Sequence, residues 1–211
     1  MSAAKPDVRR WAGLTVLGFL MLAGSYLLMY FVCRYRDGFP FNPGIDLLVA
    51  AMPRKDWSWV LSQGYILFLT GFYLYWIRSD WRKLAFLLAA TAVMMTVRDV
   101  FLLLTPVGPL PGLIPLYQGV AGVRGTLEFD GELFFSGHTG APFLYFLASR
   151  RHPAVSLVCL LVSLTNGLGV LLTRNHYAID VLGAFVIVPT VYAMSRRLFG
   201  WMDSEREAVP A

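Results

Sequence analysis

Two short polar stretches in the C-terminal half of the chain hold residues whose types and spacing suit chemistry. One covers positions 130–139 and contains His138; the other covers positions 174–180 and contains His176 and Asp180. Each lies where a polar loop runs into an apolar segment. His176 and Asp180 are four residues apart, so on a helix they would share one face, and the carboxylate would hold one imidazole nitrogen while the other reacts. With His138 as acid–base partner, the pattern predicts an activated histidine nucleophile or base.

Both stretches resemble signature blocks of the sphingomyelin synthase-like branch of the type-2 phosphatidic acid phosphatase superfamily. That family has a Gly-Asp-aromatic-Leu-aromatic-Ser-Gly-His-Thr block and a later His-Tyr-x-x-Asp-Val block. Here they read Gly131-Glu132-Leu133-Phe134-Phe135-Ser136-Gly137-His138-Thr139 and His176-Tyr177-Ala178-Ile179-Asp180-Val181. Glu132 is a departure, since the family has Asp there. The resemblance covers roughly residues 98–192, and it implies that His138, His176 and Asp180 are catalytic.

The composition indicates an integral membrane protein. Of the 211 residues, 57% are hydrophobic and only 15% are charged, whereas a soluble domain of this length would carry more charge. The length allows one domain, residues 1–211. The net charge of +5 comes from basic residues between apolar runs, which is typical of membrane topology and gives no reason to expect nucleic acid as a partner. Cys33 and Cys159 are not expected to form a disulfide, and no pattern of metal ligands or cofactor motif is seen.

Apolar runs long enough to cross a bilayer predict an all-α membrane protein with six transmembrane helices. The expected spans are residues 11–33, 57–77, 84–104, 133–148, 153–172 and 177–198. A short interfacial helix is expected at residues 45–52.

Lys and Arg are more frequent on the side of the termini, which places both termini in the cytoplasm. The loops after the first, third and fifth spans then face outward, and the histidine blocks lie near the outer face. The short termini favour a bacterial inner membrane with a periplasmic site, although an organelle lumen is the alternative.

Arg98 is about 9 Å deep in the third span, at 1.5 Å per residue. A charge at that depth needs either an ion-pair partner or a function. A structural pair is one interpretation; a clamp on phosphate oxygens, which a guanidinium matches well, is the one we favour. The family resemblance supports the clamp, because its members have an Arg in this span followed by a Thr and a Leu-Pro-x-Pro-Gly turn, similar to Thr105 and residues 109–112 here.

Ser136 lacks the small-residue elbow of serine hydrolases, so it is not expected to be a nucleophile. Together with Gly137 and Thr139 it is expected to give N–H or hydroxyl donors to phosphate. Glu132, with Glu128 and Asp130, forms an acidic cluster that is either a solvated loop edge or attracts a cationic head group and tunes His138.

Arg174, Tyr177 and the start of the sixth helix are further candidate parts of the site at the second block. Arg174 is either an interfacial anchor or a second phosphate contact, and Tyr177 is expected to line the site. The start of the sixth helix, with Asn175 as its cap, is expected to favour phosphate through its free N–H groups.

The resemblance implies a phospholipid head-group transferase. The phosphatase members of the superfamily carry a Lys-x6-Arg-Pro block, a Pro before Ser-Gly-His and an Arg six residues before the second His; here Phe135 and Val170 stand at the last two positions. We therefore expect transfer of phosphocholine or phosphoethanolamine, through a phosphohistidine, from a glycerophospholipid to a ceramide-like or other lipid alcohol, with release of diacylglycerol. The alternatives are a lipid phosphate phosphatase, a phospholipase C and, third, a small lipid transporter. Membrane lipids are the expected partners, and the oligomeric state stays open.

Overall fold

The structure is a computed structural model that describes residues 7–36, 38–39, 42–105, 107–116 and 133–207. It is mostly helical, as expected, and two short strands pair in parallel. The elements in chain order are α1 (Val8–Arg36), β1 (Asn42–Pro43), α2 (Leu47–Ala51), the π-helix η1 (Val60–Gly64), α3 (Tyr65–Asp80), α4 (Lys83–Leu104), β2 (Val107–Gly108), α5 (Gly137–Ala148), α6 (Pro153–Leu172), α7 (Ala178–Phe199), the 3₁₀ helix η2 (Gly200–Met202) and α8 (Ser204–Glu207).

Five helical segments in the described part of the chain are long and apolar enough to cross a membrane. They are Val8–Arg36, Val60–Asp80, Lys83–Leu104, Pro153–Leu172 and Ala178–Met202. Each overlaps a span predicted from the sequence, and the bounds differ by a few residues. The chain therefore has the character of an all-α integral membrane protein.

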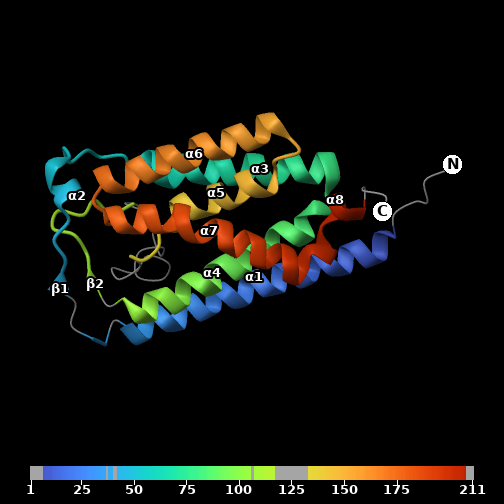
Figure 1. The fold of residues 1–211 in the computed structure, drawn as a ribbon, viewed down its shortest axis with the longest axis horizontal. Helices are drawn as coiled ribbons and strands as arrows, with labels where there is room; N and C mark the ends of the chain where they lie inside the picture. The colour runs from blue at the N-terminus through green and yellow to red at the C-terminus, as the bar shows by residue number, and fades with distance from the viewer. Residues whose placement is uncertain (1–6, 37, 40–41, 106, 117–132, 208–211) are drawn as a thin grey trace.

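The expected fourth span, residues 133–148, is shorter in the structure. Its helix, α5, has 12 residues and begins only at Gly137, which gives a length of about 18 Å. Ser136 stops the helix from starting earlier, because its backbone is extended and its side chain caps the helix by accepting a hydrogen bond from Thr139 N. α5 is mostly buried and packs against α4, α6 and α7, so it is an interior element of the bundle (Figure 1).

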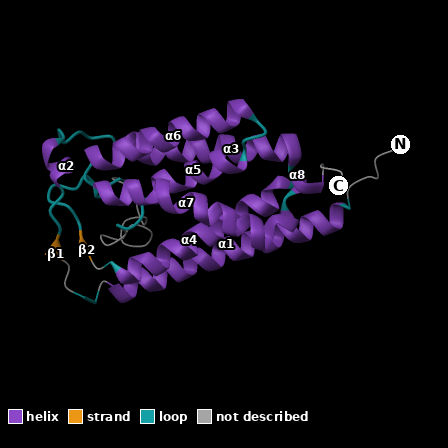
Figure 2. Cartoon of the chain, viewed as in Figure 1, coloured by secondary structure: helices purple, strands orange, loops and turns teal. Residues whose placement is uncertain are grey.

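The start of α1 and the helix α8 lie at one end of the bundle (Figure 1). At the opposite end lie α2, β1 and β2, with the last turn of α6 and the first turn of α7 (Figures 1 and 2). At the first end, the fully buried Lys83 is bonded to Asp203 and Glu205, which fixes the C-terminal segment to α4. That this end faces the cytoplasm stays a prediction from the distribution of Lys and Arg along the sequence.

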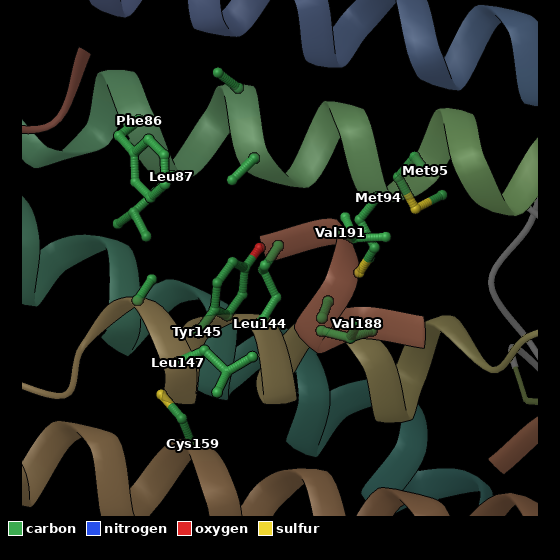
Figure 3. Close-up of a cluster of buried hydrophobic side chains, with 14 of the residues drawn as sticks. Phe86, Leu87, Met94, Met95, Leu144, Tyr145, Leu147, Cys159, Val188 and Val191 are labelled. Carbon is green, nitrogen blue, oxygen red and sulfur yellow. The ribbon is translucent and has the colours of Figure 1, made fainter. Parts of the chain in front are cut away.

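The core of the bundle forms around α4, whose side chains contact α5 and α7. Figure 3 shows this cluster of buried apolar side chains, among them Phe86, Met94, Leu144 and Val188. On its other side α4 packs closely along α1. At the crossing, a Cβ added to Gly18 would lie only 2.8 Å from the carbonyl oxygen of Ala85. Small residues allow this backbone approach in membrane helices, where van der Waals packing drives association.

We predict that Gly18→Ala destabilises the protein by about 1–3 kcal/mol, because α1 must move away from α4 to admit the methyl group. Gly24→Ala, on the same helix, is the matched control, since nothing lies within 4 Å of the added atom. Thermal unfolding of the two variants in detergent micelles would measure the difference. Equal melting temperatures would show that α1 and α4 do not pack as described.

Candidate active site

His176 is buried in the loop that leads into α7. Its Nδ1 lies 2.7 Å from the carbonyl oxygen of Leu133 and 3.1 Å from Oδ2 of Asp180. Because a carbonyl oxygen only accepts hydrogen bonds, Nδ1 must carry the hydrogen, and Nε2 of the neutral imidazole then holds the lone pair. Nε2 makes no hydrogen bond to another described residue. The arrangement therefore fixes the tautomer in which Nε2 is the nucleophilic or basic nitrogen.

The pairing of His176 with Asp180 is present, but the two residues do not share a helical face as expected. α7 begins only at Ala178, so the histidine precedes the helix and the aspartate lies in its first turn. Oδ2 of Asp180 also accepts a hydrogen bond from Tyr177 N at 2.9 Å. One carboxylate oxygen thus holds the start of α7 and the imidazole at the same time.

The non-helical segment 133–136 connects the parts of the site. Its Leu133 carbonyl accepts from His176, and Ser136 N donates to the carbonyl oxygen of Asp180 at 3.1 Å. Between them, the carbonyl oxygen of Phe135 accepts from Nε of Arg98 at 2.9 Å. Three backbone groups of four consecutive residues therefore bring α4, α5 and α7 into contact at one place.

Arg98 lies buried on α4 beside the start of α5. Its Nη1 is 3.7 Å from the sulfur of Met29, and a Cβ added to Gly137 would lie 3.8 Å from its Nε. The neighbouring Asp99 is also buried. The guanidinium therefore reaches the loop that carries the first block, where a positive charge can face an anion bound at the start of α5.

The first turn of α5 offers backbone N–H groups next to this arginine. The N–H of Gly137 and that of His138 donate to no other described residue, whereas Thr139 N is taken by Ser136 Oγ. Ser136 and Thr139 are fully buried, and their hydroxyl groups bond to each other at 3.1 Å. The two hydroxyls thus shape the helix start, while the N–H groups lie beside the guanidinium of Arg98, an arrangement whose chemistry suits an anion.

His138 is the second residue of α5, and its ring packs against Tyr65 with 4.9 Å between the centroids. Its Nε2 is buried and has no hydrogen-bond partner in the described part of the chain. His138 therefore has a nitrogen available for proton transfer within the site.

The backbone carbonyl of His138 accepts a hydrogen bond from a side chain in place of the usual backbone N–H of its own helix. Pro142, four residues on, has no N–H to donate to the carbonyl of His138. Nδ2 of Asn166, on α6, donates to that carbonyl instead, at 3.1 Å. The hydrogen bond from Asn166 thus ties the first turn of α5 to α6.

Tyr177 and Arg174 hold loops in the structure. The hydroxyl of Tyr177 accepts from Gly44 N at 2.7 Å and donates to the carbonyl of Gly108 at 2.8 Å. Burial raises the pKa of Tyr177, so the hydroxyl stays protonated and can make that donation. Arg174 has a positive φ of 59°, and its Nη1 donates to the carbonyl oxygen of Pro111 at 3.2 Å.

The start of α7 is not the open anion site that the sequence suggested. Asn175 does not cap this helix: its Nδ2 donates to the carbonyl of Ile114 at 2.7 Å. The N–H of Tyr177 and the N–H of Ala178 are already taken by the carboxylates of Asp180 and Asp46. At the start of α5, by contrast, the N–H groups of Gly137 and His138 donate to no other described residue.

Glu132, with Glu128 and Asp130, lies outside the described residues. Within them, no group of three or more His, Cys, Asp and Glu side chains is gathered that would hold a metal ion. Cys33 and Cys159 are both buried and are not joined in a disulfide.

The sequence reasoning missed Asp46, Arg54 and Asn166. Nε of Arg54 donates to the carbonyl of Gly112 at 2.7 Å, in the loop that Arg174 also contacts. An asparagine inside an apolar span, and an Asp directly before a short apolar helix, were the available signals for the other two.

We predict that neutral His176 is protonated at Nδ1 and bears its lone pair at Nε2. Long-range ¹H–¹⁵N correlation spectra of ¹⁵N-histidine-labelled protein would distinguish the two nitrogens. Asp180→Asn should keep this tautomer, because the Leu133 carbonyl remains as acceptor. A proton on Nε2 in the wild-type protein would contradict the geometry.

Comparison with known proteins agrees with these observations at a coarse level. Residues 131–197 match the family model described as PAP2 superfamily C-terminal, and this region contains His138, His176 and Asp180. A search of curated proteins found no match. The match supports a relation to the PAP2 superfamily and, in general terms, an activity of the lipid phosphatase or phosphotransferase type.

Proposed function

We propose that the protein is a phospholipid head-group transferase of the sphingomyelin synthase type that works through a phosphohistidine. The observation that carries the proposal is the hydrogen bond from His176 Nδ1 to the Leu133 carbonyl. Because Nδ1 carries the hydrogen, the lone pair of Nε2 is left to act as the nucleophile. The membrane-spanning helices make a lipid the natural substrate. The charge distribution supports a site on the outer face of a bacterial inner membrane.

In the first step Nε2 of His176 attacks the phosphorus of a glycerophospholipid. The N–P bond forms while the P–O bond to diacylglycerol breaks, and protonated His138 gives its proton to the leaving oxygen. Arg98 and the N–H groups of Gly137 and His138 stabilise the charge on the phosphoryl oxygens. Asp180 stabilises the positive charge that develops on His176.

In the second step the hydroxyl of an acceptor lipid, such as the primary alcohol of a ceramide, attacks the phosphohistidine. His138, now neutral, takes the hydroxyl proton, the new O–P bond forms and the N–P bond breaks. Water in place of the lipid would make the enzyme a phospholipase C, and a phosphomonoester donor would make it a phosphatase. The phenylalanine before Ser136 and the valine six residues before His176 favour the transferase.

Purified protein in liposomes with head-group-labelled phosphatidylcholine or phosphatidylethanolamine, with and without ceramide, tests the reaction. We expect a ceramide-dependent labelled lipid, which His176→Ala should abolish, whereas His138→Ala should slow turnover about 10²–10⁴-fold. His152→Ala, at the opposite end of the bundle, is the control and should keep full turnover. Soluble labelled head group without new lipid would instead identify a phospholipase C, and free phosphate from phosphatidic acid alone a phosphatase. No product from any lipid would favour transport.

A donor with a good leaving group separates the two histidines. p-Nitrophenyl phosphocholine needs no protonation of its leaving oxygen, so it should restore the first step in His138→Ala but not in His176→Ala. Release of nitrophenol measures this step directly. Rescue of His176→Ala and not of His138→Ala would reverse the assignment of the two roles.

We expect Arg98→Lys to lower kcat by about 10²–10³-fold, because the ammonium keeps the charge but loses the planar donor pair and the bond to Phe135. Arg36→Lys is the matched control. Arg36 is also buried and donates from Nη2 to a backbone carbonyl, that of Thr105 at 3.1 Å, but at the end of α1. Equal losses in the two variants would mean that Arg98 acts only on the fold.

A further inference from the structure

Asp46 is a carboxylate shared by two helix starts. Its Oδ1 accepts from Leu48 N and from Val49 N, each at 3.0 Å, and so caps α2. Its Oδ2 accepts from Ala178 N, the first residue of α7, at 2.5 Å. The two helices are far apart in the sequence, so this one side chain joins the loop after α1 to the catalytic block.

The same loop makes further contacts around the first turn of α7. Gly44 N donates to the hydroxyl of Tyr177, and β1 pairs with β2, whose Gly108 carbonyl accepts from that hydroxyl. A Cβ added to Gly44 would lie 3.3 Å from the tyrosine ring. The residue before α7 is therefore enclosed by the loop, and Asp46 holds the helix itself.

The position of this turn decides the geometry of His176. The turn carries Asp180, whose Oδ2 contacts Nδ1 of His176, and the histidine lies two residues before Ala178. A displacement of the turn therefore changes the distances from His176 to Asp180 and to the Leu133 carbonyl together. Small displacements of a reacting group cost up to about 10²-fold in rate.

The carboxylate also takes one of the N–H groups that an anion could use at the start of α7. The start of a helix attracts anions through its N–H groups and its dipole. Ala178 N is bonded to Asp46 and Tyr177 N to Asp180, so two N–H groups at the start of α7 are already taken, whereas those of Gly137 and His138 on α5 donate to no other described residue.

We propose that Asp46 is a positioning residue, which acts through the first turn of α7 to hold His176 in its reactive orientation. Its effect on turnover rests on the proposed function, whereas its effect on α7 does not. The test therefore needs one measurement of turnover and one measurement of the α7 start that does not depend on turnover.

Asp46→Asn and Asp46→Ser separate the two bonds. Asn and Ser both cap helices well through a single oxygen, so α2 keeps its cap, but neither has a second acceptor for Ala178 N. Asp56→Asn is the matched control: Asp56 accepts from Ser58 N at 2.9 Å at the same end of the bundle and contacts no part of α7 that the structure describes.

Two measurements on the full-length protein in nanodiscs are independent of turnover. Hydrogen–deuterium exchange with peptide mapping should show faster exchange at residues 177–181 in both Asp46 variants, with the rest of α7 unchanged. The rate of diethyl pyrocarbonate modification of His176, read by mass spectrometry, should change by about threefold or more relative to His152. Asp56→Asn should change neither.

In the liposome reaction, the Asp46 variants should lose about 10- to 100-fold in kcat with KM within about twofold of wild type. Unchanged exchange at residues 177–181, or faster exchange with unchanged kcat, would overturn the proposal. If wild-type protein turns over no lipid, the proposed function fails, and the exchange and modification data alone then decide whether Asp46 positions His176.

Discussion

The hydrogen bond from Nδ1 of His176 to the carbonyl of Leu133 is the contact on which the candidate site depends. It joins residues 43 positions apart, and it sets the tautomer in which Nε2 of His176 holds the lone pair. For the carbonyl to reach the imidazole, segment 133–136 must stay out of a helix. Ser136 ensures this by capping α5. In the same segment, the carbonyl of Phe135 accepts a hydrogen bond from Arg98, and Ser136 N donates one to the carbonyl of Asp180 on α7. The geometry of the candidate site and the packing of the helices therefore depend on the same hydrogen bonds.

A second constraint is the distribution of backbone donors and acceptors in a largely apolar bundle. Burying an unpaired backbone group is costly, and side chains supply partners for several irregular backbone groups near the site. Asn166 replaces the donor that Pro142 lacks, and two carboxylates take the first N–H groups of α7. The start of α5 keeps its N–H groups and has Arg98 beside it. The start of α5 thus combines N–H donors and a guanidinium, a combination that suits the phosphate of the proposed substrate.

The long helices and the candidate site residues could be predicted from the sequence. The features that could not be predicted all depend on backbone groups or on contacts between distant parts of the chain. Hydropathy predicted the five long spans, and the family model also covers His138, His176 and Asp180, whose catalytic roles stay a proposal. Hydropathy did not give the late start of α5, because the cap at Ser136 leaves the apolar residues 133–135 outside the helix. The Leu133 carbonyl is a backbone group that any residue would supply. Asp46 reaches α7 only through long-range folding, so no local pattern reveals its second bond.

The most direct test of the account is to trap the covalent intermediate. Protein mixed with head-group-labelled phospholipid in the absence of acceptor would be quenched under alkaline conditions within the first turnover, digested and mapped by mass spectrometry. The account predicts acid-labile phosphocholine or phosphoethanolamine on the peptide that contains His176, attached at Nε2 and absent when His176 is replaced. Label on the peptide with His138, or turnover without any labelled peptide, would contradict it.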